Sequence, residues 1–270
     1  MLPVIIMLYQ KMEDVIGKKL HFAERELRSD IIPPGTTELG DWAYAQCSAL
    51  EWIALPVSVH MLGKDVFRGC SALKYAYYYD HDDFSLENVS EESHGIAALN
   101  ALALRYFREP LSVLLPSELP SEGELLSWDL CCFEYLGQPD DLGFAPFMAG
   151  GEEDYEENEE QLESFRNRRQ RLKALIIYTR LLAEQAGSLP FDKDNKEKYN
   201  RLFRSCPEAF PLLDRIDSHY EESAKIYAEA GLLTPETLQD VLSTLNPSNV
   251  KMRSALIRDL SADPFARLSL

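Results

Sequence analysis

The chain has 270 residues, 46% of them hydrophobic, which is typical of globular proteins and sufficient for one large domain or two ordinary ones. Its formal net charge of −18 argues against nucleic acids and anionic membranes as partners, since both require a basic face. The charge suits either plain solubility or a basic partner. Five cysteines, an odd number without a Cys-x-x-Cys pair, predict reduced thiols and a cytoplasmic location.

The chain opens with the apolar segment MLPVIIMLY. This segment is too short to span a bilayer, and it lacks the cationic start and the small-residue cleavage site of a secretion signal. We therefore expect either an extra strand or a non-native start, with Met12 as the alternative first residue.

A 23-residue repeat follows. The letters CSAL occur at Cys47–Leu50 and again at Cys70–Leu73, and the neighbouring residues repeat at the same offset. The matching pairs are Pro33 with Pro56, Leu39-Gly40 with Leu62-Gly63, and Tyr44 with Phe67. An incomplete copy precedes them at Ile16-Gly17. A period between 20 and 29 residues is typical of a leucine-rich-repeat solenoid, in which each copy buries the apolar face of the next.

Each copy contains the same predicted parts. Leu-Gly predicts a strand end at a tight turn, because glycine tolerates a close approach. The segments WAYAQC and VFRGC place apolar side chains at helical spacing, and LEWIAL predicts a short strand. Cys47 and Cys70 share one repeat position, so we expect them to be buried neighbours. In an oxidising compartment they are the candidate pair for oxidation.

The order of Ile-Pro, Leu-Gly, an aromatic residue and Cys-Ser-x-Leu resembles the bacterial BspA-type leucine-rich repeats, over residues 31–79. The resemblance implies a solenoid fold, and it implies cell-surface or secreted relatives as an alternative to a cytoplasmic location. Members of that family commonly carry many more repeats than this chain.

The middle of the chain has a different character. HGIAALNALALRYF, from His94, predicts a strand or a helix that covers the end of the solenoid. Prolines at 110, 116 and 120 predict irregular connections. ELLSWDLCCFEYL has a loosely helical pattern of apolar residues, namely Leu125, Leu126, Leu130, Phe133 and Leu136. A Pro- and Gly-rich loop then predicts a domain boundary near Gly150–Gly151.

The last part of the chain predicts helices. Acidic residues are concentrated in Glu152–Glu163, and basic residues follow in Arg166–Lys173. Acids before bases along one helix complement the helix dipole, so this segment predicts a helix with a solvated start. The arginines there predict either intramolecular pairing or an anion patch. Gly231 predicts a helix end, and Thr234-Pro235 predicts the next helix start. Residues 219–260 are similar to the ankyrin-like helix pairs that follow leucine-rich repeats in some bacterial proteins.

The predicted fold class is therefore α/β. A short leucine-rich-repeat solenoid of two to three repeats is expected in residues 1–90. Residues 91–150 form a capping and connecting region, and residues 151–270 form a mainly α-helical, repeat-like domain.

Two functions from different classes are predicted. The first is a non-enzymatic protein-interaction module without cofactor or metal, whose partner is an unknown protein. Its binding residues point outward from the strand face: Glu51, Trp52, Ala54, Lys74, Tyr75 and Tyr77. Large aromatic rings on a rigid frame suit an interface. The alternative for this face is that residues 150–270 cover the rings as internal core.

The second function is a hydrolase or metal-dependent enzyme with a site near Asp80–His94. DHDD, at Asp80–Asp83, is the densest group of possible metal ligands, although adjacent residues seldom converge on one ion. This hypothesis requires His81 or His94 within hydrogen-bond reach of a nucleophile or of a second carboxylate. The Cys131-Cys132 pair favours a core position over redox chemistry.

Overall fold

The structure is a computed structural model that describes residues 21–80, 84–116, 120–144, 153–185, 189, 192–216 and 218–261. The chain forms two compact units, Met1–Cys131 and Cys132–Leu270. The division falls inside a helix, α3 (Glu122–Leu136). The predicted boundary at Gly150–Gly151, the apolar first residues and the Ile16-Gly17 copy all lie outside the described residues.

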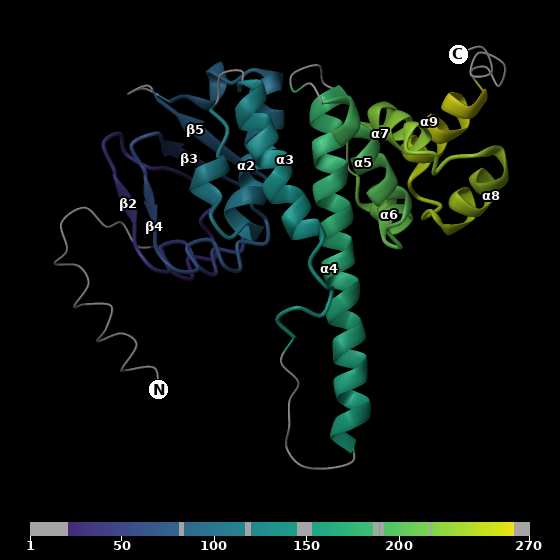
Figure 1. The fold of residues 1–270 in the computed structure, drawn as a ribbon, viewed down its shortest axis with the longest axis horizontal. Coiled ribbons are helices and arrows are strands. Elements are labelled where there is room, and N and C mark those ends of the chain that lie inside the picture. The colour runs from purple at the N-terminus through teal and green to yellow at the C-terminus, as the bar shows by residue number, and fades with distance from the viewer. Residues whose placement is uncertain are drawn as a thin grey trace. The chain divides into compact units, whose positions relative to one another are not determined.

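The described part of the first unit contains two small parallel sheets (Figure 1). The three-stranded sheet has the order β1-β3-β5, and the two-stranded sheet pairs β2 with β4. The strands are β1 (Ser29–Ile31), β2 (Glu38–Leu39), β3 (Trp52–Pro56), β4 (Met61–Leu62) and β5 (Tyr75–Tyr79).

The strand pairing follows the 23-residue repeat. Ser29 pairs with Trp52 and Trp52 pairs with Tyr75, while Leu39 pairs with Leu62 in the smaller sheet. At Gly63 a Cβ atom would lie 2.3 Å from the backbone nitrogen of Asp41, so the close approach of adjacent copies requires glycine there. The predicted strand end at Leu-Gly is confirmed.

The predicted leucine-rich-repeat solenoid is wrong. The chain is about half helical, and its described part has only five short strands in two small parallel sheets, with no closed coil. Two clear copies of the repeat bury too little apolar surface to stack as an independent solenoid. Helical packing supplies the rest of the core.

The segments predicted at helical spacing are also not helices. Residues 41–46 and 64–69 form successive turns. Positive φ angles recur 23 residues apart, at Trp42 and Asp65 and at Gln46 and Gly69. A residue in the left-handed region breaks an α-helix, so the apolar spacing of these segments does not produce one.

The run that begins at His94 lies in a helix, α2 (Glu91–Tyr106), which packs on β5. Ser90 caps its first turn, accepting a hydrogen bond from the Ser93 N–H. Near its end, Arg105 donates from Nη1 to the carbonyl oxygen of Leu73 at 3.1 Å. Helix α2 therefore covers a face of the three-stranded sheet.

The helical pattern predicted for the segment ELLSWDLCCFEYL is confirmed by α3, but only some of its apolar residues are buried. Trp128 and Cys132 are fully buried, whereas Leu126 and Leu130 are 48% and 61% exposed. The buried positions recur every three or four residues from Leu125, which is the period of one helix face. The two exposed leucines lie between those positions.

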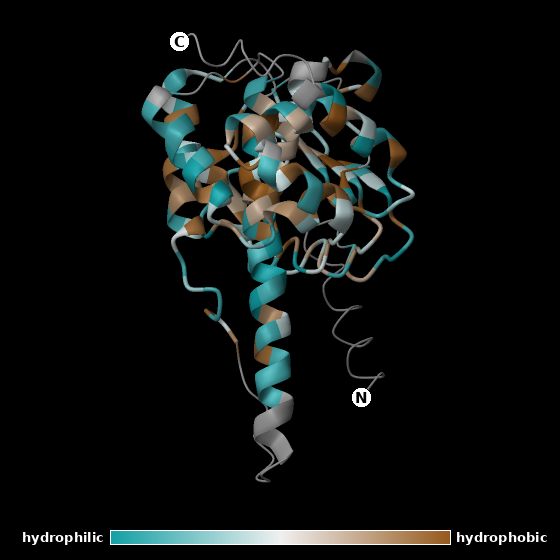
Figure 2. Cartoon of the chain, turned by 90° about the vertical axis from the view of Figure 1, so that its right-hand side faces the viewer, coloured by the Kyte–Doolittle hydropathy of each residue, from teal (hydrophilic) through white to brown (hydrophobic). Residues whose placement is uncertain are grey.

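The second unit is helical in its described part. Helix α4 (Glu153–Gln185) packs against α5 (Lys193–Arg204), α6 (Ala209–Leu212) and α7 (Tyr220–Glu229), and α7 packs against α9 (Val250–Ser261). The coloured residues in the first half of α4 are mainly hydrophilic (Figure 2), whereas Ala174, Ile176 and Ile177 in its second half are buried. The predicted division of this helix into a solvated start and a core-facing end is confirmed.

The predicted helix ends in this unit are confirmed as well. Gly231 follows α7 with a φ of 71°, as a C-terminal cap requires. Thr234 and Thr237 form a capping box at the start of α8 (Pro235–Thr244), which stops before Pro247. Short 3₁₀ helices occur at Leu86–Asn88, Pro110–Val113 and Leu213–Arg215.

Candidate functional site

The strongest candidate site is a group of partly exposed rings where β3, β5 and α2 meet. We call it the aromatic surface, and it consists of Trp52, Tyr75, Phe84 and His94, each of them partly buried. The Trp52 ring lies 6.4 Å from Phe84, and the Tyr75 ring lies 5.4 Å from His94. Tyr77 lies beneath all four rings and contacts each of them.

The strand register places the first two rings side by side. Trp52 and Tyr75 are direct partners in adjacent parallel strands, and Ala54 and Tyr77 are the next partners on the same face. The small Ala54 side chain leaves room for Tyr77, whose ring packs against Ala97 of α2 within one apolar cluster. A rigid frame therefore supports the rings.

His94 is held by its own helix. Its Nδ1 atom lies 3.0 Å from the carbonyl oxygen of Ser90, and because a carbonyl only accepts, Nδ1 carries the hydrogen. The ring is nearly perpendicular to Tyr75 and Tyr77, at 77° and 84°. In the neutral ring the Nε2 atom then remains an acceptor on a partly exposed side chain.

The six predicted binding residues divide into two groups. Lys74 is exposed and Glu51 is partly exposed, with its carboxylate 3.0 Å from Arg28. Trp52 and Tyr75 keep part of their rings accessible. These four residues are accessible to a partner.

Ala54 and Tyr77 belong to the other group, and the predicted outward exposure of these two residues is wrong. Ala54 is fully buried and Tyr77 is 2% exposed. The element that covers them is α2 of the same unit.

Burial fixes the chemistry of Tyr77. Removal from water, together with the neighbouring Tyr75, raises the pKa of Tyr77 to about 12. Its hydroxyl therefore stays protonated in the physiological range, and its role is to pack against the surrounding rings.

The enzyme hypothesis depends on a region that is only partly described. His81, Asp82 and Asp83 lie outside the described residues, and Asp80 is exposed. Where the chain is described, no group of three or more His, Cys, Asp or Glu side chains could hold a metal ion. The contact of His94 Nδ1 is with a backbone carbonyl. The hydrolase or metal-dependent enzyme stays an untested prediction.

The two repeat cysteines are buried, as predicted, with Cys47 at 0% and Cys70 at 1% exposure. Cys47 donates its thiol hydrogen to the carbonyl of His21 at 2.9 Å, and Cys70 donates to that of Tyr44 at 3.0 Å. Burial raises the pKa of both thiols, that of Cys70 to about 12. A neutral thiol is a poor nucleophile, so these cysteines are structural.

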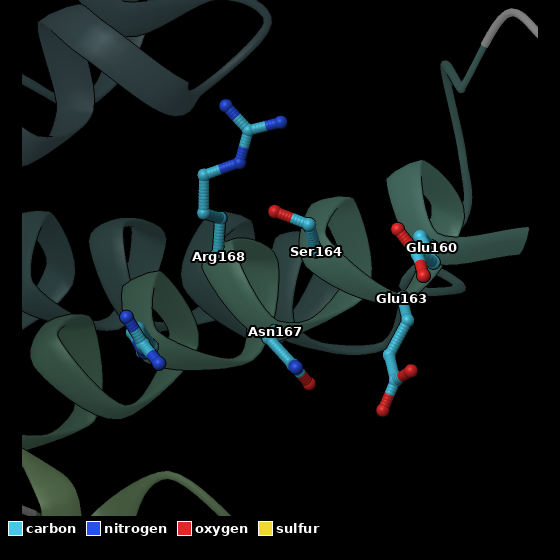
Figure 3. A pocket seen from close by; sticks show the side chains of 6 residues that line it. Glu160, Glu163, Ser164, Asn167 and Arg168 are labelled. Atoms are coloured by element: carbon cyan, nitrogen blue, oxygen red, sulfur yellow. The ribbon is translucent and has the colours of Figure 1, made fainter. Parts of the chain in front are cut away.

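The arginines of α4 are mostly paired within the second unit. Arg166 lies 3.2 Å from Asp141, Arg169 donates to Gln138, and Arg171 lies 2.6 Å from Glu208. Pairing, the first of the two predicted alternatives, is confirmed for these three residues. Arg168 is exposed and points away from its helix (Figure 3).

An open hollow runs along the same helix. Its lining residues all come from α4 and are mostly exposed: Glu160, Glu163, Ser164, Asn167, Arg168 and Arg171 (Figure 3). A hollow formed by one helix face, with both charge signs in its lining, has no walls that would exclude water from a ligand. It is therefore a weaker candidate than the aromatic surface.

Sequence reasoning missed a polar cluster around His21. The His21 ring stacks on Tyr44 at 5.2 Å, and Tyr44 stacks on Phe67 at 5.6 Å. The three residues are spaced 23 apart, so extending the repeat alignment backward by one copy could have found His21 at the aromatic position. Phe84 and His94 had no such signal, because they lie outside the repeat.

No protein family, curated protein or solved structure shows significant similarity to this chain. The BspA-type and ankyrin-like resemblances consequently remain expectations. Over the residues that the structure describes, no helix is both long enough and apolar enough to cross a membrane.

Proposed function

We propose that the chain is a non-enzymatic protein-interaction module that binds a partner protein at the aromatic surface. The observation that carries the proposal is the group of four partly exposed rings, Trp52, Tyr75, Phe84 and His94, supported from beneath by buried Tyr77. Aromatic side chains offer large contact areas at small conformational-entropy cost, and they are enriched among the residues that dominate binding energy.

Charged residues adjoin two of these rings in the sequence. Glu51 directly precedes Trp52, Lys74 directly precedes Tyr75, and Arg28 pairs with Glu51. The formal charge of −18 makes a protein partner more plausible than nucleic acid or an anionic membrane. An apolar centre with a polar rim is the usual composition of a protein–protein interface.

Quantitative affinity capture tests the proposal. Tagged wild-type chain is compared with the double variant Trp52→Ala, Tyr75→Ala, and bound proteins are quantified by mass spectrometry. We expect at least one protein retained by the wild type to fall by about tenfold or more, since truncating a central hot-spot residue costs about 2 kcal/mol or more and about 1.4 kcal/mol is tenfold.

Trp42→Ala is the matched control. Trp42 is 48% exposed, and it lies in a turn outside the aromatic surface. The control should retain every captured protein, and both variants should fold with the wild-type circular dichroism spectrum. Equal capture by the wild type and the double variant would refute the proposed role of this surface.

We also propose a cytoplasmic location, supported by the five cysteines, all of which are free thiols in the structure. A cell-surface or secreted location is the alternative. Fractionation of the source cells, with detection of the native chain by antibody, distinguishes the two locations.

A further inference from the structure

His21 lies between two carboxylates at the start of the described chain. Its Nδ1 atom is 2.9 Å from Glu24 Oε2, and its Nε2 atom is 3.3 Å from Asp30 Oδ2. Both are close ion-pair contacts without hydrogen-bond alignment. His21 is 8% exposed, and its ring stacks on Tyr44. This arrangement gives each ring nitrogen its own negatively charged neighbour.

Only one protonation state of the ring suits both neighbours. An ionised carboxylate has acceptor oxygens and no donor, and a neutral imidazole has a single N–H. A neutral ring therefore leaves one ring nitrogen without a hydrogen beside a carboxylate oxygen. The positive charge of the imidazolium offsets both negative charges, and this attraction does not require hydrogen-bond alignment.

Among the residues that the structure describes, the Tyr44 hydroxyl and the Cys47 thiol lie close to this group and are neutral. The Tyr44 hydroxyl donates to Asp30 Oδ2 at 2.6 Å, and the Cys47 thiol donates to the His21 carbonyl. Burial, followed by the hydrogen bond to Asp30 and its negative charge, raises the pKa of Tyr44 well above its ordinary value. Burial also raises the pKa of Cys47. Among these described neighbours, the negative charge next to the His21 ring therefore comes from Glu24 and Asp30.

The His21 cluster connects the first described turn to the next copy of the repeat. The backbone N–H of His21 donates to Ala43, and that of Ala23 donates to Ala45, at 2.7 and 2.8 Å. Asp30, at the other end of the turn, lies in β1. A change in the His21 side-chain contacts should therefore alter the strength of these two backbone hydrogen bonds, and hydrogen exchange of the amides can measure that change.

We propose that His21 is a proton-dependent clamp, which as imidazolium bridges Glu24 and Asp30 and holds the segment from His21 to Asp30 against the next repeat copy. Loss of the second ring proton removes one bridge and leaves two carboxylates facing a neutral ring. The clamp therefore stabilises this contact while the ring carries both protons, and that stabilisation is lost when the second proton leaves.

Hydrogen exchange on the full chain tests the clamp, with the backbone amide of Ala23 as the reporter and that of Gly63 as an internal reference. Rates are divided by the intrinsic rate at each pH. Between about pH 5 and about pH 8.5, we expect the protection of Ala23 to fall roughly tenfold relative to Gly63, the size expected for one charge-assisted contact. In His21→Gln the fall should disappear.

His60→Gln is the matched control, because His60 is exposed and lies outside the cluster. It should leave the wild-type pH dependence unchanged. If His21→Gln does not fold, Glu24→Gln replaces it and should reduce the fall. Ring ¹⁵N shifts provide an independent readout, with both His21 nitrogens protonated at about pH 5. A neutral ring at that pH, or a fall that persists in the variant, would overturn the proposal.

Discussion

The ring of Tyr77 lies 5.8 Å from the ring of His94 and is nearly perpendicular to it, at 84°. The two residues belong to β5 and α2, which follow one another in the chain and pack together. This contact makes Tyr77 a core residue of the first unit. Tyr75, two positions earlier on the same strand face, stays partly exposed.

The two tyrosines should therefore differ in what their removal costs. Tyr77→Ala should lower the free energy of unfolding by roughly 3–5 kcal/mol, because truncating a buried ring leaves a cavity. Tyr75→Ala should cost less than half as much. Urea unfolding of both variants provides the comparison. Equal losses would contradict the placement of α2 over Tyr77.

Alkaline pH should destabilise both units. Burial raises the pKa of Tyr77 and of Tyr178 to about 12, from an ordinary value of 10.0. Since the unfolded chain loses these protons first, the stability from each neutral tyrosine is fully present below about pH 10 and is lost as the pH rises through about 12. Such a difference corresponds to about 2–3 kcal/mol per tyrosine.

Thermal melts between pH 8 and 12 provide the measurement for the tyrosines. Tyr77→Phe cannot ionise and should flatten the alkaline decline of the first unit. A decline in this variant as steep as in the wild type would show that another group is responsible.

Cys47 and Cys70 should be unreactive in the folded chain. At pH 8 a thiol-specific reagent should leave Cys47 and Cys70 unmodified, because both are buried and protonated. All five cysteines should react in denaturant. Cys70→Asp should lower the free energy of unfolding by several kcal/mol, since it places an unpaired charge in the core. Rapid native labelling of either residue would contradict its burial.

Gly63→Ala should destabilise the first unit. The added methyl group would meet the backbone nitrogen of Asp41 at 2.3 Å, and relieving that contact requires a backbone shift. We expect a loss of about 1–3 kcal/mol, as for other overpacked sites. Gly123→Ala, where a Cβ meets nothing within 4 Å, is the matched control and should be neutral or slightly stabilising.

Parts of the candidate site could be predicted from the sequence. The repeat offset alone pairs Trp52 with Tyr75, because the side-chain period and the register of parallel strands follow from it. The repeat offset could not predict that Phe84 and His94 belong to the aromatic surface, since no spacing rule relates these residues to the strands. Their positions depend on where the chain turns after β5.

The local structure of this protein follows from short-range patterns in its amino-acid sequence. The 23-residue period determines the strand register and the buried position of Cys47 and Cys70, and Gly231 and Thr234 determine where helices end and begin. These features depend on backbone geometry and on contacts between adjacent copies, which are encoded within a few dozen residues.

Which surfaces are covered depends instead on tertiary packing. The strand segments WIALP and YAYYY are apolar on both faces, so period-two alternation does not distinguish the core face from an exposed face. The packing of α2 on β5 removes Ala54 and Tyr77 from water and leaves Trp52 and Tyr75 partly accessible. That outcome depends on the free energy of burying one particular helix face, which no local pattern specifies.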